Sequence, residues 1–373
     1  MRFKPVFACV GVLALVAAAC GGDDTELIDG DGAADDGTAA EGEDPEEGDP
    51  EEGDPGEVDA EVDEVLSGEG IPEFISIGTG GTGGAYYPIG GAAGAMLANG
   101  IEGVQSGVAE TTGGSVENIQ LLNDERTEII LAQGDAVFDG WEGNEPFDGP
   151  QEIRTIGMAY VNLGQWVTTA DTGIESFADL VGNRFSTGDA GSGTEVFTMN
   201  VLESLGVDAN EIDIQRLSFD DQTAAIRNGQ LEAGSWIVAP GASSIADLAS
   251  SEDIVVIPFS DEDVDAVVAD HPYYVGYPLE AGVYQGQDEE VQTLGTWNSW
   301  MMHPNASEDF AYAVTKLLHE NVDILAQGHP SGGDLDAENI NESLTPLHVG
   351  AIRYFEEIGI ELDDALYPDE YEG

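Results

Sequence analysis

The chain has 373 residues and a formal net charge of −66, with 75 acidic side chains against 9 lysines and arginines. This charge excludes most nucleic-acid-binding roles and docking on anionic lipid, because both surfaces are bound through Lys and Arg. Hydrophobic residues make up 41% of the chain, which is enough for a folded core. The cysteines are Cys9 and Cys20, so the chain after them offers no disulfide, no cysteine-based zinc site and no thiol nucleophile.

The first twenty residues read as an export signal. Arg2 and Lys4 precede an apolar run at residues 6–19, which is of signal-peptide length and short for a membrane span. Small residues then lead to Cys20, an arrangement that resembles a bacterial lipobox, in which the cysteine is lipidated after cleavage. We therefore expect a signal peptide at residues 1–20 and an extracytoplasmic protein held to the membrane by a lipid on Cys20. An ordinary secretory signal with an incidental Cys20 is the alternative.

Residues 21–70 contain 22 acidic residues and no basic one. Low hydrophobicity with high charge cannot offset the entropy of ordering, so we expect a disordered acidic linker. A calcium-binding role is the alternative, but no EF-hand spacing is present. The remainder is also strongly acidic, and a compact body of this charge repels itself unless salt screens it. We interpret this as halophilic adaptation, which concerns the solvent and not the function.

From residue 71 onward the chain alternates strand-like and helix-like runs, which indicates an α/β fold. Apolar positions at helical spacing, such as Val196, Met199, Leu202 and Leu205, support the helices. The expected strands are residues 74–77, 103–109, 129–132, 153–160, 165–169, 184–186, 213–217, 234–238 and 254–258. The expected helices are residues 85–98, 115–122, 176–180, 194–205, 220–228, 261–269, 307–327 and 346–358.

Three glycine-rich loops lie where an expected strand meets an expected helix: residues 78–84, 111–115 and 188–194. Glycine lets the backbone approach a ligand closely, and the following helix start offers unpaired N–H groups with a partial positive charge. Such loops can bind an anion without any basic residue. Each loop alone could be simple capping, but three together favour a shared small-molecule cleft at the carboxyl ends of the strands.

Nucleotide binding is the competing interpretation of the first loop. A Walker loop requires a lysine, which is absent here. Residues 78–83 match the G-x-G-x-x-G pattern of dinucleotide-binding folds, but no clear acidic partner for a ribose follows the second strand. We therefore predict no cofactor.

Several long stretches together resemble the TAXI class of TRAP-transporter solute-binding proteins. They read IGTGGTGGAYYPIGGA, TGGSVENIQLL, LAQGDAVFDGW, GSGTEVFTMNVLESLG and HPYYV. The resemblance covers roughly residues 74–359. It implies a two-lobed type II periplasmic-binding-protein fold with the ligand cleft between the lobes. We expect lobe I at residues 71–160 and 275–373, and lobe II at residues 161–274.

The same resemblance implies a binding protein and not an enzyme. Its ligand would be a small carboxylate, such as a dicarboxylate, a keto acid or an amino acid like glutamate. Its partners would be the TRAP membrane permease subunits, to which it would deliver the ligand. The alternatives are a sensory subunit for a membrane kinase, which would have a similar folded domain, or a secreted hydrolase. No G-x-S-x-G or H-E-x-x-H motif supports an enzyme.

Motif matching assigns the ligand carboxylate to the first glycine loop, with Tyr87 as a wall or hydroxyl donor and Trp236 as a stacking candidate that could equally be core. Gln133 could donate to a carboxylate, whereas Asp135 could bind a ligand ammonium or simply cap a loop. No arginine is assigned to the cleft. The full set of candidate ligand-binding residues is Thr79, Gly80, Gly81, Thr82, Gly83, Tyr87, Thr112, Ser115, Gln133, Asp135, Gly191, Ser192, Gly193, Thr194 and Trp236.

Overall fold

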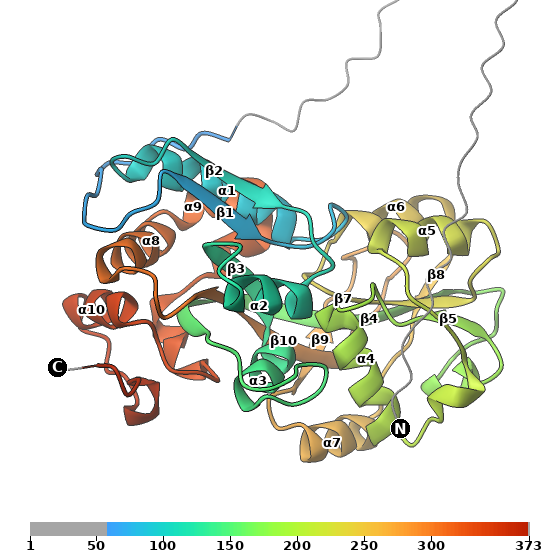
Figure 1. Cartoon of the computed structure of the whole chain (residues 1–373). Coiled ribbons are helices and arrows are strands. Elements are labelled where there is room, and N and C mark those ends of the chain that lie inside the picture. The colour runs from blue at the N-terminus through green and yellow to red at the C-terminus, as the bar shows by residue number, and fades with distance from the viewer. Residues whose placement is uncertain (1–57, 372–373) are drawn as a thin grey trace, which may run out of the picture. The chain divides into compact units, whose positions relative to one another are not determined.

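The structure, a computed structural model, describes residues 58–371, which belong to one compact unit. The expected signal peptide, the lipidation site Cys20 and most of the acidic linker lie outside the described residues. The described part is an α/β fold built on a mixed sheet of 10 strands (Figure 1). The expected α/β class is therefore confirmed.

The sheet has the strand order β2-β1-β3-β10-β4-β7-β5-β6, with β8 paired to β4 and β9 to β10. β1 is parallel to β2 and β3, and β5 is parallel to β6 and β7. β4 and β10 run antiparallel to each other in the middle of the sheet. The strands are β1 Phe74–Gly78, β2 Ser106–Glu110, β3 Ile129–Gln133, β4 Arg154–Thr169, β5 Arg184–Ser186, β6 Asp213–Gln215, β7 Ala233–Val238, β8 Ile254–Val256, β9 Val275–Leu279 and β10 Val291–Met302.

The same pattern thus occurs twice, once on each side of the central β4–β10 pair. We call β1–β3 with helices α1–α3 the first half, and β5–β7 with helices α4–α6 the second half. In each half a parallel strand is followed by a helix, so the carboxyl ends of the strands coincide with helix starts. The α-helices are α1 Tyr86–Gly100, α2 Ser115–Asn123, α3 Gly134–Glu142, α4 Gly193–Ser204, α5 Phe219–Arg227, α6 Ser243–Ser251, α7 Asp261–Asp270, α8 Glu308–Glu320, α9 Val322–Gly328 and α10 Val349–Glu357.

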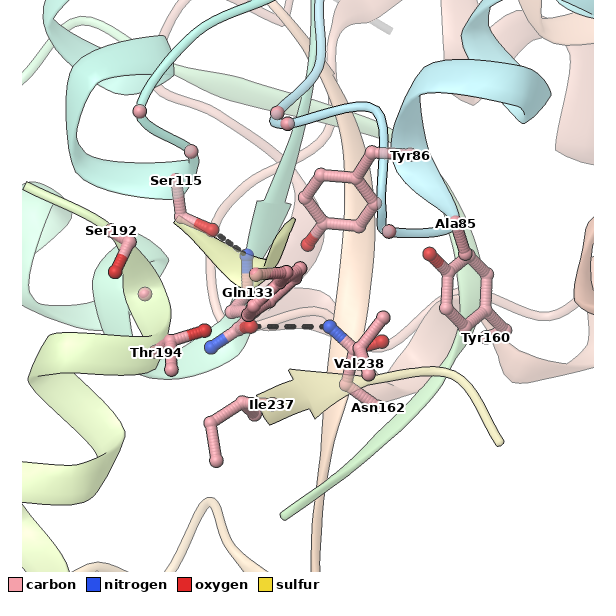
Figure 2. Close-up of a pocket in the computed structure, with 17 residues that line it drawn as sticks. Ala85, Tyr86, Ser115, Gln133, Tyr160, Asn162, Ser192, Thr194, Ile237 and Val238 are labelled. Carbon is pink, nitrogen blue, oxygen red and sulfur yellow. Dashed lines mark hydrogen bonds between the residues drawn. The ribbon is translucent and has the colours of Figure 1, made fainter. Parts of the chain in front are cut away.

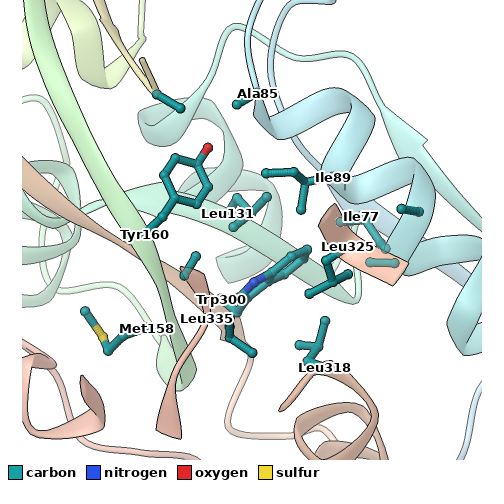
Figure 3. Packing of buried hydrophobic residues seen from close by; sticks show 14 of the residues in the cluster. Ile77, Ala85, Ile89, Leu131, Met158, Tyr160, Trp300, Leu318, Leu325 and Leu335 are labelled. Carbon is teal, nitrogen blue, oxygen red and sulfur yellow. The ribbon is translucent and has the colours of Figure 1, made fainter. Parts of the chain in front are cut away.

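Two hydrophobic clusters stabilise the halves. The first packs α1 and α8 against β1 and β3, with Trp300 of β10 only 1% exposed among Ile77, Leu131 and Leu318 (Figure 3). The second surrounds Trp166 of β4, which makes edge contacts with Phe177 and Phe197. The first cluster also includes Trp236, Ile245 and Leu248 of the second half, so it extends across both halves, and β4 contributes to both clusters. Within residues 58–371, no helix combines the length and apolar character needed to cross a membrane.

Several expected boundaries differ from the structure. The two strands expected at residues 153–160 and 165–169 are one 16-residue strand, β4, which is buried through almost its whole length. The helix expected at residues 307–327 is divided into α8 and α9 at Asn321, whose backbone leaves the helical region with φ −131° and ψ 42°. Helix α6 was not among the expected elements, and no separate bounds were expected for β9 and β10.

Residues 58–70, which were assigned to the disordered linker, pack on the folded body. Ala60 is buried, and the Leu66 amide donates to the Gly100 carbonyl at 2.7 Å. The Asp59 amide donates to the Gln327 side chain at 2.9 Å. The physical reason is the apolar residues interspersed among the acids, because Val58, Ala60, Val62 and Leu66 join the first cluster. The lobe boundaries beyond residue 70 remain a prediction.

Candidate functional site

A cavity lies between the two halves, at the carboxyl ends of their strands. Its empty volume is about 420 Å³, including the part open to solvent. The first half contributes the starts of α1 and α2 and the end of β3, and the second contributes the starts of α4 and α5 and the end of β7. Its lining is Gly80, Gly81, Gly84, Ala85, Tyr86, Gly113, Gly114, Ser115, Gln133, Tyr160, Asn162, Ser192, Gly193, Thr194, Phe219, Ile237 and Val238.

Two helices begin at the cavity from opposite sides. α2 begins at Ser115, and α4 begins at Gly193 after the N-cap Ser192, whose hydroxyl accepts from the Glu195 amide at 3.1 Å. The first amides of α4, on Gly193 and Thr194, have no intrahelical acceptor, because the first turn of any helix lacks one. Together with the partial positive charge of both helix starts, these donors favour an anion in the cavity.

Gln133, the last residue of β3, connects the polar groups of the cavity. Its backbone N–H donates to Ser115 Oγ at 3.1 Å, and its side-chain oxygen accepts from Asn162 Nδ2 at 3.1 Å (Figure 2). The Ser115 oxygen accepts this bond, and its hydroxyl group can in addition donate one hydrogen bond. Gln133 is therefore fixed in place by the first half and by β4, and its side-chain NH2 group faces the second half.

The wall formed by β4 carries two buried polar atoms that lack a partner among the described residues. These atoms are the Tyr160 hydroxyl and Asn162 Oδ1, on side chains that are each 2% exposed. Both residues line the cavity, and Figure 2 shows them facing the same space as Tyr86. Buried polar atoms are rarely left unpaired, so these two mark positions where a ligand can complete a hydrogen bond.

The Tyr86 hydroxyl, by contrast, already has a partner. It donates to Asn298 Oδ1 of β10, which also accepts from Asn162 Nδ2 at 3.1 Å. Asn298 is held in turn by a bond from its Nδ2 to the Tyr160 carbonyl, at 2.8 Å. The ring of Tyr86 meets that of Tyr160 edge-on, with centroids 6.3 Å apart. This buried network joins the start of α1 to both central strands.

The second half supplies an apolar wall. Phe219, Ile237 and Val238 line the cavity there. Trp236 lies one layer behind: it is fully buried, and its ring stacks on that of Phe219 with centroids 6.4 Å apart. Trp236 therefore supports the wall, and its ring does not reach the cavity.

None of the described residues that line the cavity carries a charged side chain. Burial raises the pKa of Tyr86 and of Tyr160, so both phenols stay neutral. The carboxyl group of Asp135, two residues after Gln133, is fully buried and does not line the cavity. Burial raises the pKa of Asp135 to about 7, against the opposing effect of hydrogen bonds from Tyr274 and Ala136. Any positive potential in the cavity thus comes from helix starts and neutral donors.

The two halves are in contact around the cavity, which makes this a closed arrangement. The Gly83 carbonyl accepts from Ser244 Oγ at 3.0 Å, and Thr82 donates to Asp220 at 3.2 Å. On the other side the Glu117 amide, in the first turn of α2, donates to the Gly191 carbonyl at 3.3 Å. These contacts join the two halves on two sides of the cavity.

The structure brings seven of the candidate residues to the cavity and places eight elsewhere. Thr79 and Thr112 are engaged within the first half, where their hydroxyls donate to the Glu110 carbonyl and to Asn118, each at 2.6 Å. Tyr87 faces a separate groove beside α1 and β2. The seven are Gly80, Gly81, Ser115, Gln133, Ser192, Gly193 and Thr194, and the eight are Thr79, Thr82, Gly83, Tyr87, Thr112, Asp135, Gly191 and Trp236.

Sequence reasoning missed the polar residues of the central strands and the apolar wall. Tyr160 and Asn162 lie within β4, and Asn298 lies within β10, so their meeting depends on strand pairing between distant segments. Two signals were present, because Asn162 and Asn298 are amide residues in otherwise apolar stretches. Phe219 and Ile237 gave no comparable signal.

A comparison with family models gives one match, over residues 77–359, to a model described as the NMT1-like family. This range is more than half of the chain. The protein belongs to the NMT1-like family. The match begins within β1 and ends after α10, so it includes every element that lines the cavity.

Two solved structures illustrate what this chain is similar to. One is a putative L-cystine ABC transporter protein from Listeria monocytogenes, with 13% identity and a TM-score of 0.44, matched over 71% of this chain and 98% of that one. Another is the periplasmic aliphatic sulphonate binding protein SsuA from Escherichia coli, with 11% identity and a TM-score of 0.39, matched over 77% of this chain and 83% of that one.

Proposed function

We propose that this protein is an extracytoplasmic solute-binding protein that captures a small carboxylate and delivers it to a membrane permease of the TRAP type. The observation that carries the proposal is the cavity itself: two helix starts, from α2 and α4, meet there with the Ser115 and Thr194 hydroxyls and no basic side chain. Such donors stabilise an anion through fixed dipoles. The buried unpartnered atoms of Tyr160 and Asn162 are a second, independent sign of a ligand.

The site favours a carboxylate that also carries a hydrogen-bond donor. Asn162 Oδ1 can only accept, so its ligand partner is an N–H or O–H group. An amino acid such as glutamate, or a hydroxy acid, meets this requirement better than a plain dicarboxylate. The neutral lining also fits a binding role better than hydrolysis, since none of the described residues that line the cavity is a histidine or a carboxylate that could act as a base.

The location is part of the same proposal. A signal peptide ending at Cys20, with a lipid on that cysteine, would hold the protein at the outer face of the membrane. An acidic linker would then carry the folded body away from the surface. The similarity of the glycine loops to the TAXI class supports the choice of permease.

A ligand screen tests the proposal. We expect L-glutamate, 2-hydroxyglutarate, 2-oxoglutarate or succinate to raise the melting temperature of the full chain at molar KCl, with an affinity then measured by calorimetry. Thr194→Val should weaken binding of the best ligand about tenfold, because it removes one hydrogen bond to a charged group.

Thr198→Val is the matched control. Thr198 lies one turn further along α4 and is fully buried, but it does not line the cavity. The proposal fails if no carboxylate in the panel stabilises the protein, or if the Thr194 and Thr198 variants lose affinity equally.

A further inference from the structure

The two halves are joined outside the cavity by a buried contact between a carboxyl group and a phenol. Asp135, in the first turn of α3, accepts from the Tyr274 hydroxyl at 2.8 Å, and both residues are fully buried. Tyr274 lies just before β9 and belongs to the hydrophobic cluster of the second half. The contact therefore connects a helix of the first half with the core of the second.

Tyr274 also holds α4, the helix whose start lines the cavity. Its ring stacks on that of Phe197 with centroids 3.9 Å apart, and its oxygen accepts from Asn200 Nδ2 at 3.0 Å. Phe197 and Asn200 both belong to α4. Any movement of Tyr274 relative to Asp135 is thus transmitted to the start of α4.

Asp135 also lies close to Gln133, a residue of the first half that lines the cavity. Its Oδ1 lies 3.5 Å from Gln133 Nε2. The same nitrogen is 2.6 Å from the point that a Cβ on Gly193 would occupy. Gln133 is therefore placed between the Asp135 carboxyl and the first residue of α4, so the contact and the cavity share one side chain.

The protonation of Asp135 in this closed arrangement is governed mainly by burial, because no Lys or Arg side chain within residues 58–371 forms an ion pair with it. Asp139 on the same helix is a second carboxyl whose pKa is raised by burial, and His271 moderates that shift. The His271 ring itself contacts the Tyr273 hydroxyl, at 3.0 Å. The phenols of Tyr273, Tyr274 and Tyr86 have raised pKa values and stay neutral.

We propose that Asp135 and Tyr274 form a clasp that positions the start of α4 over the ligand, and that closing the clasp takes up one proton from solvent onto Asp135. This rests on the proposed function, because a binding protein must open to admit its ligand. When the halves separate, Asp135 is exposed and its pKa returns toward the ordinary value of 3.8; in the closed state it is about 7. Between these values closure adds a proton, so the closed state loses stability as the pH rises through 7.

Calorimetry tests the clasp directly. L-glutamate is titrated into the full chain at molar KCl, between pH 5.5 and 8, in pairs of cationic or zwitterionic buffers that differ in ionisation enthalpy, MES and Bis-Tris below pH 7 and HEPES and Tris above it. We expect uptake of close to one proton per ligand near pH 6 and about a tenth near pH 8. The association constant should fall as the pH rises. The decrease should approach tenfold per pH unit below pH 6.5, and the constant should no longer depend on pH above pH 8.

Single substitutions distinguish the Asp135–Tyr274 contact from the neighbouring titratable groups. Asp135→Asn should abolish the proton uptake and make affinity independent of pH, whereas Asp139→Asn and His271→Gln should leave the uptake in place. Tyr274→Phe should weaken binding about tenfold, and Tyr273→Phe should not. Uptake that survives in Asp135→Asn, or that disappears in Asp139→Asn, overturns the proposal, as does equal behaviour of the two tyrosine variants.

A measurement without ligand distinguishes this proposal from the proposed function. Hydrogen exchange at the amides of residues 192–196, expressed as protection factors, reports how firmly the start of α4 is held. We expect protection to decrease between pH 6 and 8 in the natural chain and to be constant in Asp135→Asn. If glutamate does not bind but this difference appears, the clasp holds and the ligand assignment fails. If the two proteins show the same pH dependence, the clasp is wrong.

Discussion

Two glycine-rich loops of similar composition contribute different groups to the cavity. The loop before α1, residues 78–84, has five glycines, and the loop before α4, residues 188–194, has three. The first brings only backbone to the cavity, at Gly80, Gly81 and Gly84. Its threonine hydroxyls are engaged within the protein. The second brings three consecutive residues, two of them with hydroxyl groups, to the start of a helix.

The difference shows what glycine signifies in each place. In the first loop it allows close approach to the other half, because a Cβ on Gly84 would lie 3.2 Å from the Phe219 ring. In the second loop the close approach is to Gln133 and Ser115, which line the cavity. A glycine-rich turn before a helix therefore indicates a close neighbour, and at Gly84 and Gly193 alike the neighbour that a Cβ would meet is protein of the other half.

The largest effect is expected from Gly193→Val in the second loop. The new Cβ would lie 2.6 Å from Gln133 Nε2 and 2.8 Å from Ser115 Oγ, across the boundary between the halves. We expect the affinity for the best ligand to fall at least about 100-fold, since closure is blocked, which corresponds to about 2.7 kcal/mol. Opening relieves the clash, so the melting temperature without ligand should change little.

Gly91→Ala is the control for adding a Cβ near a glycine-rich segment. Gly91 lies inside α1, where a Cβ meets nothing within 4 Å. This variant should bind normally and gain about 0.5–1 kcal/mol of stability, because alanine is the better helix former. Normal ligand affinity in Gly193→Val, measured by calorimetry, would contradict the assignment of the second loop.

A smaller effect is expected from Gly83→Val in the first loop. The assignment of the ligand carboxylate to this loop predicts that the change abolishes binding and leaves the fold intact. In the structure Gly83 does not line the cavity, and the new Cβ meets the carboxyl group of Asp220 and lies 3.2 Å from Ser244 Cβ. We therefore expect about a tenfold loss of affinity, through weaker closure.

The second-site change Asp220→Ala tests this reason. If the clash with Asp220 is the cause, the double variant should recover most of the lost affinity, because neighbouring sites of this kind are not additive. If the double variant binds no better than Gly83→Val, the first loop contacts the ligand directly, and the contrast between the two loops is wrong.

The local sequence predicted much of this fold because strand-to-helix order is encoded locally. The starts of α2 and α4 follow from a glycine turn and a hydroxyl residue before an apolar stripe, and Ser115, Ser192 and Thr194 were identified that way. The structure places all three at the cavity. Their assignment to a ligand remains a prediction.

Side chains that depend on non-local pairing could not be predicted. Asn162 pairs opposite Thr296 in the central ladder, and that register decides which face of β4 reaches the cavity. Trp236 shares a face of β7 with the cavity residue Val238, but its ring lies behind that of Phe219. Such directions follow from the sheet as a whole, and a single strand does not reveal them.

The smallest effect is expected from two tyrosines, Tyr86 and Tyr160. They differ as the two loops do, in whether the hydroxyl group is already bonded within the protein. Tyr86 follows the first loop and, like the threonines there, has its hydroxyl engaged by the protein, at Asn298. The Tyr160 hydroxyl has no partner among the described residues. Denaturant unfolding without ligand should show a loss of about 1 kcal/mol for Tyr86→Phe, and no loss for Tyr160→Phe, because only the first variant removes a hydrogen bond.

Ligand affinity should follow the opposite order. Tyr160→Phe should weaken binding about three- to tenfold if the ligand completes the bond that the protein leaves open, whereas Tyr86→Phe should alter it less. A ligand held by the helix starts alone would be insensitive to Tyr160→Phe. That result would restrict the site to the loops before α2 and α4 and would exclude the wall formed by β4. If instead Tyr160→Phe weakens binding more than Tyr86→Phe, β4 is the third element that the ligand contacts.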